Sequence, residues 1–95
     1  MVGWVDFLAR ATDRHHLTRP QILTALAAAV YDEPLPSQPT RYLVLGDDTA
    51  GEALEIVLVA QIEDRWLVIH AMPLRYRPAT HPHRVMYDNV KGPRP

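Results

Sequence analysis

Apolar residues recur at helical spacing near the start of the chain. Val5, Leu8, Ala9 and Thr12 stand at i, i+3, i+4 and i+7, which predicts a short helix over residues 4–14. The sequence Thr-Arg-Pro-Gln at 18–21 then has the form of a capping box with proline in the first turn. It predicts a second helix that ends at Glu33–Pro34, with an apolar stripe of Ile22, Leu23, Leu26, Ala27 and Val30.

The period of the pattern changes from 3.6 to 2 near residue 41. Residues 42–45, 53–62 and 66–72 predict three strands, and the segments between them carry the turn residues Gly51 and Glu63–Asp64. Two tight turns between three strands predict an antiparallel meander. The expected core residues are Ile22, Leu26, Leu54, Ile56, Leu58 and Val68.

These elements predict an α+β domain of ααβββ order, with two N-terminal helices packed on one face of a three-stranded antiparallel sheet. Three prolines make residues 32–40 an extended connection. The chain is rich in proline and arginine after Pro73, where we expect little regular structure. Residues 1–95 are expected to form a single domain with a Pro/Arg-rich C-terminal extension from about residue 78.

Composition narrows the class of protein. The chain has no cysteine, which excludes disulfides and thiolate chemistry and favours a cytoplasmic location. Its apolar runs are far shorter than the roughly 20 residues that span a membrane, and charged residues interrupt the N-terminal segment before a signal peptide pattern forms. We therefore expect a cytoplasmic protein that does not bind a membrane.

The net charge of −1 conceals a strong asymmetry. Residues 1–64 hold four arginines and ten acidic residues, a balance of −6, and residues 65–95 have a balance of +5. No acidic residue occurs between Arg65 and Tyr87, and this stretch also holds three histidines. Such a cationic pole would attract a phosphate backbone or an acidic protein.

His70 is the first candidate for chemistry. Strict alternation on the third strand would place it on the face of Trp66, Val68 and Met72. One interpretation is a half-buried histidine that fills a place at the strand end. The other is an imidazole beside Arg75 and Arg77 that transfers a proton during cleavage of an RNA phosphodiester, with arginine binding the phosphate.

Further histidines and aromatic residues have two interpretations each. His15 and His16 form either a surface pair or the source of a second imidazole for His70. Tyr76 either packs in the ordinary way or stacks on a base. The acidic residues around Gly51 are explained by turn chemistry. Neither the histidine pair nor His81-Pro-His83 places two imidazoles on one helical face, so we expect no metal site.

The order of elements and several short motifs over residues 4–77 resemble the BrnT-like and RelE-like toxins of bacterial type II toxin–antitoxin pairs. Trp4 precedes Arg14-His15-His16-Leu17-Thr18, where His15 takes the place of the family's histidine. A strand ends in Gly46, Gly51 follows in the turn, and Ile69-His70-Ala71-Met72 matches the family's third-strand motif. Met72 stands where the family tends to have arginine, so Arg75 or Arg77 would supply that cation. The family's terminal helix would be replaced by the segment Pro78 to Pro95.

The resemblance implies a metal-independent endoribonuclease, without a cofactor, that cleaves mRNA and is neutralised by a cognate antitoxin of the ribbon-helix-helix or helix-turn-helix type. A homodimer is a further expectation, because a three-stranded meander leaves two strand edges unpaired. The expected catalytic residues are His70, Arg75 and His15, and the expected RNA-binding residues are Arg65, Arg77, Tyr76 and Arg84. Two other functions stay open: a non-catalytic module that binds RNA or an acidic protein through the basic C-terminal pole, and a metabolic enzyme or ligand-binding domain that uses His70.

Overall fold

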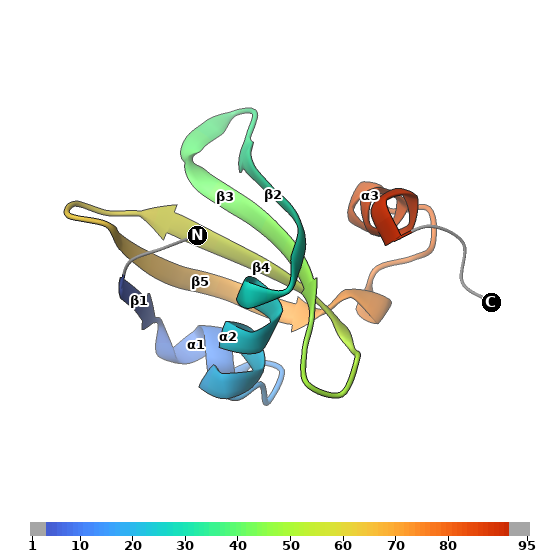
Figure 1. Ribbon diagram of the computed structural model, residues 1–95, viewed down its shortest axis with the longest axis horizontal. Coiled ribbons are helices and arrows are strands. Elements are labelled where there is room, and N and C mark those ends of the chain that lie inside the picture. Colours follow the sequence, from blue (N-terminus) through green and yellow to red (C-terminus); the bar gives the residue numbers. More distant parts are fainter. Residues whose placement is uncertain (1–3, 92–95) are drawn as a thin grey trace.

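A five-stranded sheet forms the centre of the molecule, and helices cover parts of both its faces (Figure 1). This computed structural model describes residues 4–91. In chain order the elements are β1 Trp4–Phe7, α1 Ala9–Asp13, α2 Arg19–Ala27, β2 Ala29–Leu35, β3 Gln38–Asp47, β4 Ala53–Ala60, β5 Arg65–Pro73, the 3-10 helix η1 Leu74–Tyr76, and α3 Pro82–Lys91. No helix among residues 4–91 is long and apolar enough to cross a membrane.

The sheet is mixed, with the strand order β1-β5-β4-β3-β2. Strands β3, β4 and β5 form the expected antiparallel meander, and β2 extends it as an antiparallel edge. β1 pairs with β5 in parallel, from Trp4 opposite Arg65 to Phe7 opposite Val68. The prediction of two N-terminal helices on a three-stranded antiparallel sheet is therefore wrong, because two further strands join the sheet.

Residues 4–14 do not form the single helix that their spacing suggested. Residues 4–7 form β1, and its Val5 and Phe7 pack against the core beside β5. Alternating apolar residues in so short a segment fit a half-buried strand as well as a helix, and the open edge of β5 decides between them. Only residues 9–13 are helical.

The capping box of α2 is present as predicted. The Thr18 hydroxyl accepts from the Gln21 amide at 3.2 Å, and the Gln21 side chain accepts from the Thr18 amide at 2.8 Å. The helix ends at Ala27 rather than at Glu33, because residues 29–35 pair with β3 instead. Pro34 is tolerated there because β2 is an edge strand, whose outer side makes no ladder hydrogen bonds.

Two apolar clusters lie on opposite faces of the sheet. The first joins α1 and α2 to the sheet and includes all six predicted core residues: Ile22, Leu26, Leu54, Ile56, Leu58 and Val68. The second lies under α3, where Tyr87 packs with Leu43, Leu45 and Leu74. The expectation of little regular structure after Pro73 is wrong for this part of the chain, because α3 places Tyr87 and Met86 on the second face and begins with a proline where a missing N–H does no harm.

A bulge in the pairing of β4 with β5 sets the orientation of His70. His70 lies opposite Val57, but the next pair is Val68 opposite Leu58, so Ile69 is the extra residue. The bulge breaks strict alternation, and Val68 and Ala71 both join the first cluster. The predicted face shared by His70 and Val68 is therefore wrong: His70 lies on the opposite face, beside Glu55.

Candidate functional site

A buried carboxylate stands at the centre of the second face. Glu55 is the third residue of β4, with only 1% of its surface exposed. Its Oε1 accepts hydrogen bonds from Arg77 Nε at 3.0 Å and His83 Nδ1 at 2.5 Å. Its Oε2 accepts from Arg77 Nη2 at 2.9 Å and His70 Nε2 at 2.8 Å. Each carboxylate oxygen thus has two donors.

These donors keep Glu55 ionised. Burial would raise the pKa of the Glu55 carboxyl, but the hydrogen bonds from His70, Arg77 and His83 outweigh it and hold that pKa well below its ordinary value. An ionised carboxylate only accepts, so the ring nitrogens that face it carry protons. The bond to Glu55 in turn raises the pKa of the Arg77 guanidinium.

Three separate segments supply the partners of Glu55. His70 comes from β5 just beyond the bulge, Arg77 directly follows η1, and His83 lies in the first turn of α3. Arg84 Nη1 also donates to the Arg77 carbonyl at 3.0 Å, which ties α3 to the same loop. The cluster therefore holds the C-terminal segment on the sheet as well as orienting the His70 ring.

His70 also forms part of the wall of a cavity of about 260 Å³. The other lining residues are Arg10 and Arg14 of α1, Arg41 of β3, Ile69 and Ala71. None of these three arginines forms an ion pair with an acidic side chain of residues 4–91, and the side chain of His70 is 30% exposed. The lining residues thus include three arginines and one histidine whose ring Glu55 orients, a set of residue types that suits an anion that undergoes proton transfer.

His15, Tyr76 and Arg75 form a row in which His15 and Arg75 each contact the Tyr76 ring. The ring centroids of His15 and Tyr76 are 5.5 Å apart with the rings tilted by 54°, and Arg75 Cζ lies 4.9 Å from the centroid of Tyr76. Desolvation, followed by the charges of Arg14, His70 and His16, lowers the pKa of His15. His15 is therefore within electrostatic range of His70. Tyr76 is 55% exposed, so a flat ligand has access to its ring.

The structure separates the other predicted site residues. Arg75 binds Glu52 at 2.9 Å, and no hydrogen bond joins it or His15 to His70 within residues 4–91. Arg65 lies at the far end of β5, 3.9 Å from Asp6 and over the Trp4 ring. Arg77 and Arg84 make the contacts around Glu55 described above.

Sequence reasoning missed Glu55, His83 and the cavity arginines Arg10, Arg14 and Arg41. One signal for Glu55 was present, because it is the only charged residue in the apolar strand from Leu54 to Ala60. A lone acid in a buried strand requires hydrogen-bond partners from elsewhere in the fold. The arginines gave no such signal, since they belong to the acidic part of the sequence and come from α1 and from β3, which the fold brings to the same cavity.

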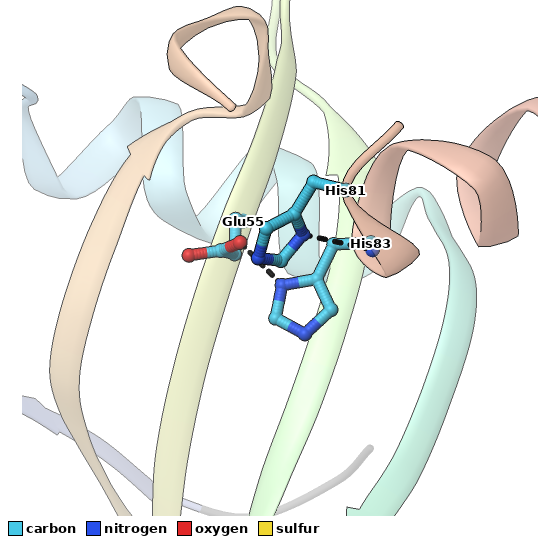
Figure 2. Close-up of side chains that lie close together, drawn as sticks. All are labelled: Glu55, His81 and His83. Carbon is cyan, nitrogen blue, oxygen red and sulfur yellow. Dashed lines mark hydrogen bonds and ion pairs between the residues drawn. The ribbon is translucent and has the colours of Figure 1, made fainter. Parts of the chain in front are cut away.

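A second set of ligating atoms shares Glu55. The side chains of Glu55, His81 and His83 each offer one atom, and these three atoms lie within 4.8 Å of one another (Figure 2). Residue spacing alone predicted no metal site at His81-Pro-His83. The third group, Glu55, comes from β4, so the spacing of the two histidines along the sequence could not reveal it.

Comparisons of the chain with protein-family models, with curated proteins and with solved structures find no match. The functional argument therefore depends on the site itself.

Proposed function

We propose that the protein is a metal-independent endoribonuclease that cleaves RNA at the cavity lined by His70, Arg10, Arg14 and Arg41. The observation that carries this proposal is that His70, whose ring a buried carboxylate binds at 2.8 Å, lines a cavity together with three arginines. Glu55 fixes the proton on Nε2 and leaves Nδ1 as the nitrogen for the substrate. The arginines would bind the scissile phosphate.

The reaction needs no group beyond these side chains, solvent water and the RNA. The ribose 2′-oxygen attacks phosphorus, the bond from phosphorus to the 5′-oxygen breaks, and the products are a 2′,3′-cyclic phosphate and a 5′-hydroxyl. His70 Nδ1 takes the proton from the 2′-hydroxyl, and a solvent water protonates the leaving 5′-oxygen, because His15 lies outside the cavity lining and its lowered pKa disfavours the protonated ring. The three guanidinium groups stabilise the charge that develops on the phosphoryl oxygens.

The row formed by Arg75, Tyr76 and His15 extends this site. Its exposed Tyr76 ring offers a stacking surface for a base of single-stranded RNA. In this proposal Arg75 acts on Tyr76 and Glu52 rather than on the reacting phosphate. The assignment of Arg75 changes accordingly from a catalytic residue to a residue that positions the ring.

We further propose the biological role that the sequence resemblance implies, the toxin of a type II pair with a cognate antitoxin. β2 offers such a partner an open strand edge on its outer side, since β3 is its single neighbour in the described sheet. Co-expression with the product of an adjacent short gene should yield a stable complex without RNA cleavage. Recovery of the two products as separate species would contradict this role.

Cleavage of a short end-labelled RNA in EDTA tests the enzymatic proposal. The wild-type protein should produce a 2′,3′-cyclic phosphate, and an RNA with a single 2′-deoxy substitution at the cleaved position should resist. Arg14→Ala and Arg41→Ala should each reduce the rate by on the order of tenfold or more, since each removes a charge-assisted contact to phosphate. His16→Asn is the matched control, because His16 lies next to His15, contributes nothing to the cavity lining and has a positive φ that asparagine tolerates. Cleavage of the deoxy substrate at the same position would rule out this chemistry.

The alternative function, a non-catalytic module that binds RNA through the basic C-terminal pole, predicts a different outcome of the same assay. The protein would bind the RNA, and the RNA would remain intact at every time point. Three cations of that pole, Arg75, Arg77 and Lys91, already pair with acidic residues of the fold. This gives the catalytic proposal more support than the alternative.

A further inference from the structure

Two histidines at the start of α3 approach the carboxylate of Glu55 from one side. His81 and His83 flank Pro82, and both rings turn toward the buried end of the Glu55 side chain (Figure 2). We propose that Glu55, His81 and His83 form a binding site for a divalent transition-metal ion of the zinc class. This site is separate from the cavity of Arg10, Arg14 and Arg41, and its existence does not depend on the proposed function.

The geometry needs only small side-chain adjustments. A zinc ion binds nitrogen and carboxylate oxygen at about 2.0–2.2 Å, so tetrahedral ligands lie roughly 3.3 Å from one another. Glu55 Oε1 and His83 Nδ1 are 2.5 Å apart and would separate slightly, whereas the widest of the three distances, at most 4.8 Å, would shorten. Neither histidine is fully buried, which leaves their rings free to shift.

The ligand set selects the class of ion. Two imidazoles and one carboxylate suit zinc, cobalt and nickel, whereas magnesium and calcium prefer ligands that are all oxygen. Three protein ligands also leave the fourth tetrahedral position to water. The other carboxylate oxygen, Oε2, stays bound to His70 and to Arg77 Nη2, which orients the metal-binding oxygen as outer hydrogen bonds do in established metal sites.

Binding would replace two hydrogen bonds of the metal-free protein. The first runs from His83 Nδ1 to Glu55 Oε1, where the ion takes the place of a proton. The second runs from the His83 amide to His81 Nδ1 at 3.1 Å. A metal bound to His81 Nδ1 displaces this hydrogen bond directly. A metal bound to His81 Nε2 requires the ring proton on Nδ1, which then can no longer accept the bond. The Arg77 Nε group at 3.0 Å from Oε1 competes for the same oxygen, so the site should bind less tightly than one with four protein ligands.

Titration of the untagged, chelator-treated protein with zinc, followed by calorimetry, tests the proposal. The wild-type protein should bind one ion, and cobalt at the same site should give the visible absorption bands of tetrahedral coordination. His81→Ala and His83→Ala should each weaken binding by about tenfold or more and remove the cobalt bands. His81 is the safer variant for folding, since its side chain forms no hydrogen bond with the Glu55 carboxylate, whereas that of His83 does.

His15→Ala and His16→Asn serve as matched controls, because His15 and His16 are the other closely spaced pair of histidines in the sequence. Binding that is unchanged in His81→Ala and His83→Ala, or lost in the control variants, would overturn the proposal, as would the absence of zinc binding by the wild-type protein. The RNA assay in EDTA is independent of this result. Cleavage that needs added zinc would contradict the metal-independent mechanism and leave the metal site standing.

Discussion

Glu55 shows how one buried charge determines the chemistry of several neighbours. Its carboxylate lies within an apolar strand, yet four donors from His70, Arg77 and His83 satisfy both oxygens. A side chain so enclosed does not touch a substrate, so Glu55 is a positioning residue in the proposed reaction. Its effect on catalysis would act through the orientation and tautomer of His70.

The first prediction concerns the acid sensitivity of the fold. Glu55→Gln should lower the free energy of unfolding at pH 7 by on the order of 2 kcal/mol. This is below the roughly 3–5 kcal/mol lost on breaking a fully buried pair, because the Arg77 side chain is 34% exposed. Because the pKa of Glu55 is depressed in the folded protein, its contribution is fully present above the ordinary value of 4.5 and is lost as pH falls below it. The difference between wild type and variant should therefore shrink below about pH 4.5, measured by urea unfolding in EDTA. A difference that stays constant down to pH 3 would argue against this origin.

Gly46 is a residue whose lack of a side chain is required by packing. A Cβ built on it would lie 2.1 Å from the Ala25 carbonyl oxygen and 3.2 Å from the Ala29 Cα. Both contacts are with backbone, so neither can be relieved by rotation of a side chain. The glycine thus permits the close approach of α2 to β3.

Gly46→Ala should destabilise the protein by about 2–3 kcal/mol, the upper part of the range for overpacked sites, since a whole helix must shift. Gly51→Asn is the control, because Gly51 has open space around its Cα and a φ of 79° that asparagine tolerates better than most residues. Thermal unfolding of the two variants decides the matter. A Gly46→Ala variant as stable as wild type would show that α2 does not approach β3 this closely.

At the scale of elements, α2 is the helix that most clearly joins the N-terminal half to the sheet. Its buried residues Ile22, Ala25 and Leu26 face β3 and β4, and Leu23 points away with 44% of its surface exposed. Leu26→Ala should cost about 2–5 kcal/mol, as expected for a large residue removed from a core. Leu23→Ala, the same change one turn away, should cost less than about 1 kcal/mol. Equal losses in chemical denaturation would mean that α2 does not present this face to the sheet.

The predictability of the elements follows their burial pattern. The meander of β3, β4 and β5 was predicted because long strands with alternating or continuous apolar residues leave little choice of structure. β1 and β2 were missed because an edge strand is decided by the neighbour that pairs with it. β1 has four residues, and β2 contains two acids and a proline. α3 was missed because its proline and charges hide an apolar side formed mainly by Met86 and Tyr87.

The candidate site was predictable only in part for a related reason. Histidine often transfers protons near neutral pH, so His70 and His15 could be chosen as candidates from the sequence alone. The bulge at Ile69, the Glu55 carboxylate that binds His70 and the arginines of the cavity depend on contacts between distant segments. No local pattern contains that information.

At the scale of the whole molecule, many of the opposite charges in the two parts of the sequence pair with each other within the fold. Acidic residues of the first 64 positions bind cations of the last 31, in the pairs Glu52–Arg75, Glu55–Arg77 and Asp47–Lys91. These pairs dock η1 and α3 on the sheet. The cations that remain for a ligand at the cavity are therefore Arg10, Arg14 and Arg41, which belong to the acidic part of the chain.

This distribution predicts how salt affects RNA binding. Affinity for a single-stranded RNA should fall linearly with the logarithm of salt concentration, and Arg41→Ala should reduce the slope by about 1, because one phosphate contact is lost. Lys91→Ala should leave the slope unchanged, since Lys91 pairs with Asp47 of β3 and does not line the cavity. Fluorescence anisotropy at several salt concentrations measures both slopes. A slope that is reduced by Lys91→Ala and unchanged by Arg41→Ala would instead place the RNA site at the C-terminal pole.

The most direct test of the central claim is the single-turnover rate of RNA cleavage by wild-type protein and His70→Ala, in EDTA and with matched circular dichroism spectra. Loss of a positioned proton-transfer group predicts a rate lower by about 10²–10⁴-fold, with RNA affinity changed far less. Cleavage by His70→Ala at the wild-type rate, or no cleavage by the wild-type protein, would contradict the account.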